Sequence, residues 1–223
     1  MDSIQYLLSI ETRGIKLGIQ RTRELMAACD NPQSGLPVIQ VAGTNGKGSV
    51  SAIISNILIN AGYKTGLFTS PHLVNVNERI RINGVPIFNK EIDLFIKSYK
   101  TDIEKYEATF FETITALAFY YFKKEDVDIA IMETGLGGRL DSVSICEPLA
   151  TIITPISYEH MEILGETLAE IAFEKAGAIK KDVVCISAKQ NSAATKVLTE
   201  KADKVKAPIH FLNGASLPNY DIN

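Results

Sequence analysis

The sequence has no surplus of positive charge, little cysteine and no long apolar run, and each shortage excludes a class of protein. Its 223 residues carry 23 Lys and Arg against 26 Asp and Glu, a net charge of -3 at pH 7. No basic surplus is therefore available to bind nucleic acid by counterion release. The longest apolar stretches, such as residues 127–132, are too short to span a bilayer. The chain begins without the basic segment of a secretory signal. We expect neither a nucleic-acid partner nor membrane association.

The three cysteines are Cys29, Cys146 and Cys185, an odd number without metal-ligand spacing. They are typical of reduced thiols that fill the core of a cytoplasmic protein. The hydrophobic fraction of 46% and the charged fraction of 22% are ordinary for a globular chain. This length suits one domain or slightly more, and we expect a monomer.

Strand and helix patterns alternate along the chain. Residues 83–84 are Asn-Gly, which favours a tight hairpin turn. The alternation predicts an α/β fold, a mostly parallel sheet flanked by helices, in which ligands bind beyond the carboxyl ends of the strands. A polar tail is expected at 217–223. Strands are predicted at 38–42, 64–69, 79–82, 85–87, 128–132, 151–156, 183–187 and 209–212, and helices at 3–11, 17–28, 50–61, 90–105, 110–123, 168–176 and 193–204.

A glycine-rich turn joins the first predicted strand to the helix that follows. Its sequence, V-A-G-T-N-G-K-G-S at 41–49, fits neither the strict phosphate-loop pattern nor the Rossmann pattern. Backbone N–H groups and a helix N-terminus can nevertheless face a phosphate there, and Lys47 adds a positive charge. A plain turn with a surface lysine is disfavoured, because three glycines, a lysine and a hydroxyl coincide. The candidate nucleotide-binding residues are Thr44, Asn45, Gly46, Lys47, Gly48 and Ser49.

Residues 42–49 resemble the nucleotide loop of folylpolyglutamate synthases and dihydrofolate synthases, which belong to the Mur-ligase superfamily. The resemblance implies a phosphate-loop NTPase-like central domain and an ATP-dependent ligase of folate biosynthesis and one-carbon metabolism. In that family, ATP phosphorylates a carboxylate of a folate or dihydropteroate, and the amino group of L-glutamate attacks the acyl phosphate. Further matching segments follow in family order at 62–73, 77–84, 109–112, 133–141, 160–165 and 174–177.

Three residues are candidate magnesium ligands. Glu133 ends a buried strand, a usual place for a Mg²⁺ ligand, although a solvated acid would look the same. Ser70 alone favours a turn, and a single histidine such as His160 is more often structural. The resemblance makes Ser70 and Glu133 magnesium ligands and assigns His160 to a second magnesium. Glu159 stands where the family usually has Asp, and its extra methylene would move a contact near that metal.

Lys175 lies in a predicted helix that opens with a capping box at 167–170. By position alone it belongs to a solvated helix face. The resemblance implies instead that Lys175 is carbamylated, so that a cation becomes an anion that supports the second magnesium. Lys47 and Lys175 are therefore the candidate catalytic residues.

The acceptor site is assigned by resemblance to three segments. A capping box at 109–112 and two core aromatics explain the central segment physically, and the resemblance adds pterin binding. The chain departs from the family at 142–144, Ser-Val-Ser for Ala-Thr-Asn, and at Lys16, which replaces an acid. The candidate residues are Lys16, Leu17, Gly18, Thr109, Phe110, Phe111, Glu112, Leu140, Asp141 and Ser142.

Members of the family are about twice as long as this chain. We therefore expect residues 1–223 to be an incomplete N-terminal ATP- and folate-binding domain, without the C-terminal glutamate-ligase domain, and to have little or no ligase activity alone. Two alternatives remain open at this point. One is a nucleotide-binding fragment without catalysis, and the other is a Mur-type peptidoglycan ligase domain.

Overall fold

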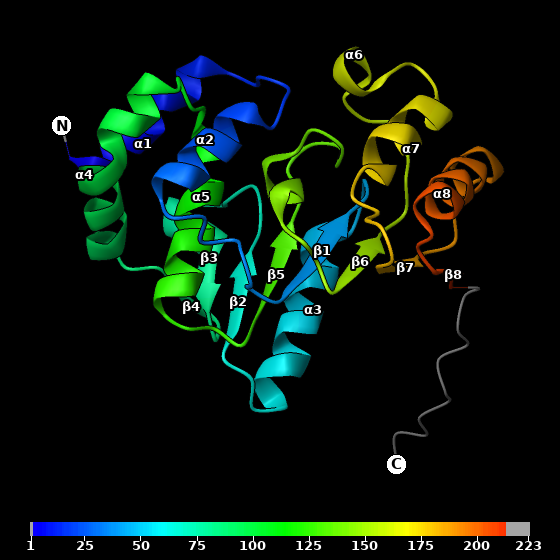
Figure 1. Cartoon of the computed structure of the whole chain (residues 1–223), viewed down its shortest axis with the longest axis horizontal. Coiled ribbons are helices and arrows are strands. Elements are labelled where there is room, and N and C mark those ends of the chain that lie inside the picture. The colour runs from blue at the N-terminus through cyan, green and yellow to red at the C-terminus, as the bar shows by residue number, and fades with distance from the viewer. Residues whose placement is uncertain (1, 213–223) are drawn as a thin grey trace.

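A computed structural model describes residues 2–212, and the expected polar tail at 217–223 lies outside them. The described chain forms an eight-stranded sheet in the order β4-β3-β2-β5-β1-β6-β7-β8 (Figure 1). The strands are β1 Val38–Ala42, β2 Thr65–Phe68, β3 Ile80–Ile82, β4 Val85–Pro86, β5 Ile129–Glu133, β6 Ala150–Ile153, β7 Val184–Ser187 and β8 Ile209–Phe211.

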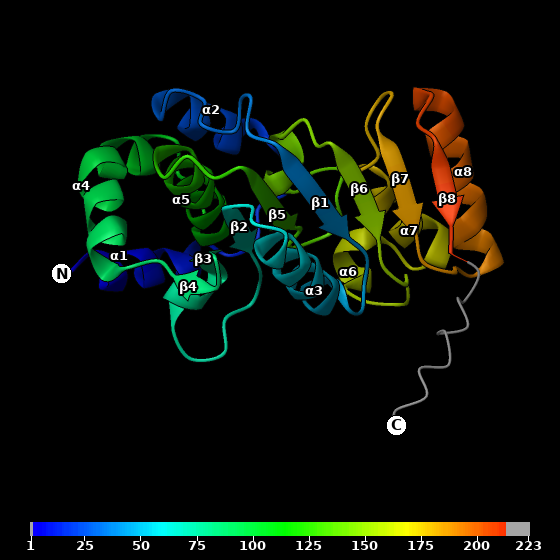
Figure 2. The same cartoon turned by 90° about the horizontal axis from the view of Figure 1, so that it is seen from below.

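Helices cover the sheet and both of its ends. Helices α1, α2, α4 and α5 gather on the side of β2, β3 and β4, whereas α7 and α8 lie beside β6, β7 and β8 (Figures 1 and 2). The helices are α1 Ser3–Ser9, α2 Gln20–Ala28, α3 Lys47–Asn60, α4 Asn89–Lys105, α5 Phe110–Lys124, α6 Met161–Leu164, α7 Leu168–Ala176 and α8 Ser192–Val205, with short 3₁₀ helices η1 Ile10–Arg13, η2 Val76–Arg79 and η3 Ser142–Ile145.

Most strand pairs are parallel, as the alternation predicts. Strand β2 pairs with β5, β5 with β1, and β1 with β6, all in parallel. The antiparallel exception is the β3–β4 hairpin beside β2. Its turn residues Asn83 and Gly84 have φ values of 48° and 79°, the left-handed region that an Asn-Gly turn supplies. The predicted α/β fold, a mostly parallel sheet flanked by helices, is confirmed.

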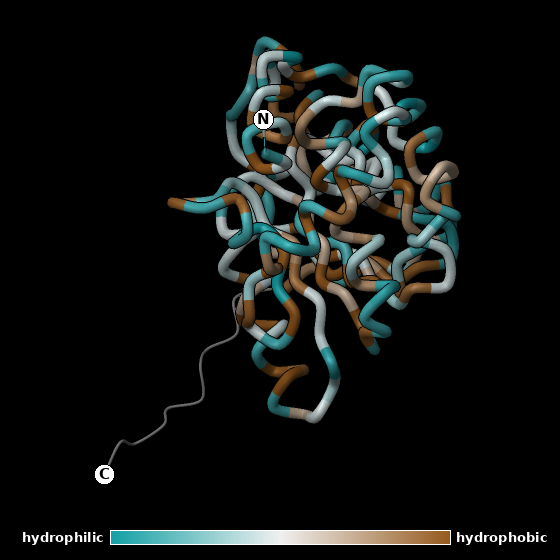
Figure 3. Tube along the Cα trace, turned by 90° about the vertical axis from the view of Figure 1, so that its left-hand side faces the viewer, coloured by the Kyte–Doolittle hydropathy of each residue, from teal (hydrophilic) through white to brown (hydrophobic). Residues whose placement is uncertain are grey.

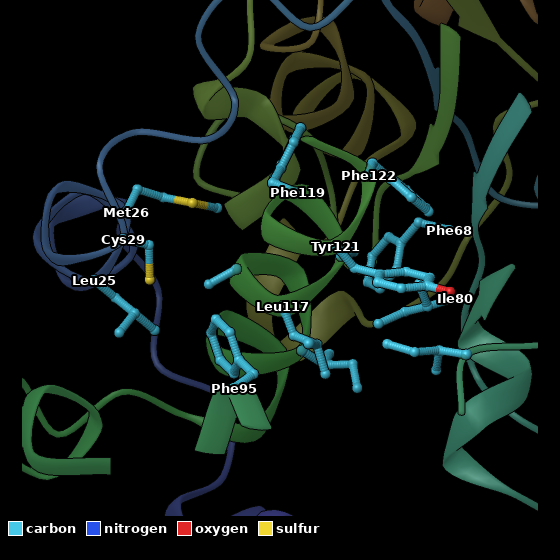
Figure 4. Close-up of a cluster of buried hydrophobic side chains, with 14 of the residues drawn as sticks. Leu25, Met26, Cys29, Phe68, Ile80, Phe95, Leu117, Phe119, Tyr121 and Phe122 are labelled. Carbon is cyan, nitrogen blue, oxygen red and sulfur yellow. The ribbon is translucent and has the colours of Figure 1, made fainter. Parts of the chain in front are cut away.

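Alternate strand residues pack against different helices. Val41, Leu67 and Ile131 form one cluster with the inner side of α3. Phe68 and Met132, their chain neighbours, belong to the cluster around α5 on the opposite face (Figure 4). Because successive side chains of a strand point to opposite faces, the continuous apolar strands indicate a sheet that is covered on both sides.

The three cysteines are free thiols in the interior. Cys29 and Cys146 belong to the cluster around α5, and Cys185 to a second cluster under α7 and α8. Burial raises the pKa of each thiol to about 12, so none is a reactive thiolate at neutral pH. This confirms the prediction that they fill the core.

Hydrophobic and hydrophilic residues alternate over short stretches of the trace (Figure 3). No helix among residues 2–212 has the length and apolar character needed to cross a membrane.

Several boundaries differ from the predicted ones. The helix predicted at 17–28 begins at Gln20, because the preceding loop contains Gly18 with φ of 120°. The helix predicted at 50–61 begins at Lys47, inside the glycine-rich turn. The strand predicted at 151–156 ends at Ile153. Helices α6, η2 and η3 were not predicted; all three are short turns without a detectable apolar period.

Candidate active site

The carboxyl ends of four neighbouring strands meet at one edge of the sheet. In the register, Val41 of β1 pairs with Glu133 of β5, Ala42 with Ile153 of β6, and Phe68 of β2 with Met132. The chain leaves β1 through α3 toward β2, whereas β6 pairs with β1 from the other side. A crevice forms at such a reversal of strand order, and it is the usual ligand site of an open α/β sheet.

The glycine-rich turn begins beyond the end of β1, and two glycines make its path possible. Gly43 has φ of 132°, and a Cβ there would lie 2.0 Å from Oγ1 of Thr154. Gly46 has φ of 84° at the N-cap of α3. A side chain at either position would strain the loop, and at Gly43 it would also collide with the segment after β6.

Thr44 and Asn45 tie the loop to the segment that follows β6. Both donate their backbone N–H to the carbonyl oxygen of Pro155, at 3.0 and 3.3 Å, and the Asn45 amide donates to Oγ of Ser157 at 3.1 Å. The first bond into α3 is donated by Val50 to the carbonyl of Gly46. The N–H groups of residues 47–49 precede it and are those that a helix N-terminus presents to an anion.

Two lysines converge on the carbonyl oxygen of Gly43. Nζ of Lys47 donates to it and to the carbonyl of Thr44, both at 3.1 Å. Nζ of Lys175 donates to it at 2.7 Å and also to the carboxylate of Glu159. Lys175 is 1% exposed, so the prediction that this lysine lies on a solvated helix face is wrong. Its ammonium instead holds the glycine-rich turn through the carbonyl of Gly43.

Lys175 and Glu159 form an ion pair in which each side chain neutralises the charge of the other. Burial raises the pKa of the Glu159 carboxyl, but the hydrogen bond and charge of Lys175 outweigh it, and the pKa lies below its usual value. Burial lowers the pKa of Lys175, and Glu159 opposes this. The carboxylate of Glu159, which stands where the family usually has Asp, thus contacts the lysine. Carbamylation of Lys175 stays a prediction.

Glu133 is a buried carboxylate beside the glycine-rich turn. It is 3% exposed, and its Oε2 accepts the backbone N–H of Ser70 at 3.2 Å. A Cβ on Gly48 would lie 3.5 Å from the same oxygen. Within residues 2–212, no Lys, Arg or His nitrogen lies within 4.0 Å of it. Burial raises the pKa of Glu133 to about 7, although the Ser70 N–H and the charges of Lys47 and Arg79 act against this.

This environment suits a magnesium ion held largely by a nucleotide. No group of three or more His, Cys, Asp and Glu side chains that could hold a metal exists in the described part of the chain. Mg²⁺, however, takes few protein ligands and completes its shell with water and phosphate oxygens. A buried carboxylate without a basic partner fits that role, and the Ser70 backbone lies against it. The metal roles of Ser70, Glu133 and His160 stay predictions.

A cleft of about 270 Å³ adjoins this edge of the sheet. Ser70 and His160, two of the predicted metal ligands, line it together. His160 is the N-cap of α6 with φ of 43°, and its side chain is half exposed. The other lining residues are Gly14, Ile15, Lys16, Leu17, Pro71, Arg79, Thr109, Phe111, Glu112, Gly135, Leu136, Leu140, Asp141 and Ser142.

Eight of the ten predicted acceptor residues therefore line one cleft. The exceptions are Gly18 and Phe110. Gly18 belongs to the loop before α2, and Phe110 is 8% exposed within the cluster around α5. The two aromatics of this segment thus separate, because adjacent helical residues point in different directions: Phe110 enters the core and Phe111 faces the cleft.

Backbone contacts shape the walls of the cleft. Asp141 accepts N–H groups from Gly135 at 2.9 Å, Leu136 at 2.8 Å and Val143 at 2.9 Å. Its carboxylate therefore holds the loop after β5. A Cβ on Gly135 would lie 2.5 Å from the ring of Phe111, so only glycine lets the ring pack there. Asp141 acts on the cleft through the loop it organises.

Two arginines near the cleft were not predicted. Nε of Arg21 donates to both carboxylate oxygens of Glu112, at 3.0 and 3.1 Å, and Arg21 also donates to the carbonyl of Lys16 at 2.9 Å. It therefore joins two walls of the cleft. Arg79 lines the cleft itself. Its position within the matching segment 77–84 was the available signal, but nothing local in the sequence indicates that its side chain is buried.

Comparison with known proteins gives consistent matches. Residues 41–213 match the Mur ligase middle domain. The dihydrofolate synthase/folylpolyglutamate synthase of Bacillus subtilis is 43% identical over 209 residues, which are 91% of this chain and 49% of that protein. An FPGS–AMPPCP–folate complex superposes with a TM-score of 0.88 at 30% identity, covering 96% of this chain and 54% of that one. A Mycobacterium tuberculosis folylpolyglutamate synthase complexed with ADP gives 0.87 at 31%, covering 96% and 51%.

The chain thus spans about half the length of the curated relative from Bacillus subtilis, 49% of it. Both structural matches extend over nearly the whole of this chain, so the sheet, the glycine-rich turn and the cleft all belong to the shared region.

Proposed function

This chain belongs to the Mur-ligase superfamily and, within it, to the folylpolyglutamate synthase family, and from that premise we propose that it supplies the ATP and acceptor sites of an ATP-dependent ligase. The acceptor is a folate or dihydropteroate, and the group added to its carboxylate is L-glutamate. Phosphates bind at the glycine-rich turn, and the acceptor binds in the adjoining cleft. The relatives' names and the folate and nucleotide complexes of the matched structures support this assignment.

The observation that carries the proposal is the junction between these two sites. Ser70 lines the cleft, and its backbone N–H donates to Glu133. Glu133 in turn lies against Gly48 at the start of α3. An acceptor carboxylate at this end of the cleft is next to the position of a nucleotide's terminal phosphate. Phosphoryl transfer depends mainly on such placement and on charge neutralisation.

In the proposed reaction, a carboxylate oxygen of the acceptor attacks the γ-phosphorus of ATP, and ADP leaves. The amino nitrogen of L-glutamate then attacks the acyl carbon, and inorganic phosphate leaves as the amide forms. The N–H groups of residues 47–49 and the ammonium of Lys47 neutralise phosphate charge. The cleft walls orient the acceptor and keep water from its activated carboxylate.

Glu133 and Ser70 would hold a magnesium ion, with His160 near a second one. Such an ion supplies charge neutralisation to the phosphate oxygens. A cytoplasmic location remains a prediction, with which the three free buried thiols agree. A monomeric state and the absence of nucleic-acid or membrane partners also remain predictions.

Calorimetry with the non-hydrolysable nucleotide AMPPCP and with pteroate, a monocarboxylate acceptor analogue, tests the proposal. We expect the chain to bind both, and to bind AMPPCP more tightly in Mg²⁺ than in EDTA. The Glu133→Gln variant should lose this magnesium dependence, whereas Glu200→Gln, at an exposed acid of α8, should keep it. Failure to bind nucleotide would overturn the proposal. Displacement of pteroate by a UDP-sugar would instead favour a peptidoglycan-type acceptor.

A further inference from the structure

Arg79 is a buried cation at the wall of the cleft. It is the last residue of η2, directly before β3, and it is 7% exposed. Its side chain lines the cleft together with Ser70 and Pro71. Burial of a guanidinium is costly unless its charge and its N–H groups are satisfied. The contacts of Arg79 therefore indicate whether its charge is satisfied within the protein or is available to a ligand.

Among residues 2–212, the protein orients this guanidinium but places no carboxylate in contact with it, and the charges of Glu11 and Glu133 act on it only from beyond 4.0 Å. Nε donates to Nδ1 of His72 at 2.8 Å, and the guanidinium carbon lies 5.0 Å from the ring centre of Phe110. Within residues 2–212, no carboxylate lies within 4.0 Å of Arg79, and its two terminal amino groups donate no hydrogen bond to the protein. Arg21, near the same cleft, differs because Glu112 binds its guanidinium.

The location of Arg79 narrows the choice of ligand. Ser70, which lines the same cleft, donates its backbone N–H to Glu133 beside the phosphate loop. The charge of Arg79 also acts on Glu133. Arg79 thus lines the cleft near the glycine-rich turn, where the proposed nucleotide binds. A planar fork of N–H donors matches a carboxylate in two parallel hydrogen bonds.

We propose that Arg79 binds the acceptor carboxylate that ATP phosphorylates, with its terminal amino groups, and that His72 and Phe110 hold the guanidinium in place for this. The inference rests on the proposed function and adds to it the residue that selects a carboxylate at the reacting end of the cleft. The two terminal amino groups hold the carboxylate in the ground state, one on each oxygen, so that a remaining lone pair of one oxygen is directed at the γ-phosphorus.

Pteroate and a carboxyl-free analogue with the same pterin-anilino skeleton test the inference. Calorimetry on the 223-residue chain should show that the wild type prefers pteroate by about 10- to 100-fold, the range expected of a charge-assisted pair. Arg79→Gln should bind the two compounds equally. Arg81→Gln, a matched control on β3 whose Nε donates to the carbonyl of Glu78, should keep the wild-type preference.

Several outcomes would overturn the inference. Arg79→Gln could retain the preference for pteroate, or it could retain that preference and lose affinity for Mg·AMPPCP, which would assign the guanidinium to phosphate. If Arg79→Gln does not fold, as judged by circular dichroism, Arg79→Lys carries the test. It keeps the charge but not the fork, so the preference should fall several-fold, and an unchanged preference would count against the inference. A wild type that binds neither compound would overturn the proposed acceptor class as well.

Discussion

Two buried cations lie at the same edge of the sheet, and they differ in what neutralises them. Lys175 of α7 is 1% exposed and pairs with the carboxylate of Glu159. Arg79 is 7% exposed and, among the described residues, contacts only an imidazole nitrogen and an aromatic ring with its guanidinium. The charge of Lys175 is therefore neutralised in the free protein by a carboxylate in contact, whereas Arg79 has no such contact among residues 2–212.

This difference separates charges that hold the site together from charges that await a ligand. A buried ion pair whose two charges neutralise each other offers no charge to a ligand. Removing one of its partners destabilises the fold, because the other charge is left buried alone. A buried charge without a partner lowers stability and is retained at positions where a ligand supplies the partner. By this criterion Glu133 is the anionic counterpart of Arg79, because it too is buried, beside the glycine-rich turn, without a basic contact within 4.0 Å in residues 2–212.

Removing the lysine of the neutralised pair should have the largest effect on stability. Lys175→Met leaves Glu159 without its partner and removes a donor from the carbonyl of Gly43. We expect the free energy of unfolding to fall by about 4 kcal/mol, within the range for breaking a buried pair. Urea denaturation measures this.

The control for this prediction is Lys196→Met, which removes the lysine of an exposed pair with Glu200 in α8. It should change the unfolding free energy by less than about 0.5 kcal/mol. The double variant Lys175→Met/Glu159→Leu should recover part of the loss, because no unpaired carboxylate remains. Equal stability of wild type and Lys175→Met would show that the pair is not a structural one.

Glu133 should make the free protein less stable as the pH rises. Its pKa is raised from 4.5 to about 7 by burial, so between these values the folded state keeps a proton that the unfolded state has lost. Stability therefore falls as the pH rises through this window, by roughly 3 kcal/mol in all at about 1.36 kcal/mol per pKa unit.

The measurement is the difference in urea unfolding between wild type and Glu133→Gln at pH 5 and pH 8. The variant lacks the titrating group, so it should be the more stable of the two at pH 8 and should lose that advantage at pH 5. Asp141, whose pKa burial also raises to about 6, is present in both proteins, so the difference retains only its coupling to Glu133. A pH-independent difference would contradict the assignment.

Much of the fold could be predicted because its signals are local. The Asn83-Gly84 turn, the capping boxes at 109–112 and 167–170, and the apolar strand that ends at Glu133 are each contained in a few consecutive residues. The strand order was not predictable in this way. The placement of β1 between β5 and β6 depends on packing between segments about a hundred residues apart.

The same distinction applies to the candidate site. The glycine-rich turn is one continuous segment, so its geometry follows from its sequence. The roles of Lys175 and Arg79 do not, because each depends on burial by distant elements: Lys175 bonds to Gly43, 132 residues away. The resemblance identified Lys175 as a functional residue but did not identify Glu159 as its partner. It included Arg79 in a matching segment but assigned that residue no role.

Lys47 extends the comparison to a cation that is only partly buried. Like Arg79, it has no carboxylate partner in contact among residues 2–212, and we expect a ligand to supply one. Its ammonium contacts two carbonyl oxygens and, among residues 2–212, no carboxylate within 4.0 Å. Lys47→Ala should weaken binding of Mg·AMPPCP by about 1.5–3 kcal/mol, roughly 10- to 100-fold, through the loss of a charge-assisted phosphate contact. Its urea midpoint should stay near that of the wild type. Lys196→Ala is the control, and an unaltered nucleotide affinity in Lys47→Ala would remove Lys47 from the phosphate site.

The smallest expected effect concerns the imidazole that orients Arg79. His72→Ala removes the acceptor of the Nε bond at 2.8 Å but leaves the guanidinium and the ring of Phe110 in place. Because this bond orients the guanidinium and does not contact the ligand, only part of its free energy reaches the binding site, and the preference for pteroate over its carboxyl-free analogue should fall about 5-fold, less than in Arg79→Gln. His72→Gln offers an amide oxygen to the same Nε and should restore most of the preference. If His72→Ala leaves the preference unchanged, the ring and the cleft wall alone hold Arg79. If glutamine fails to restore a lost preference, His72 acts through something other than this hydrogen bond.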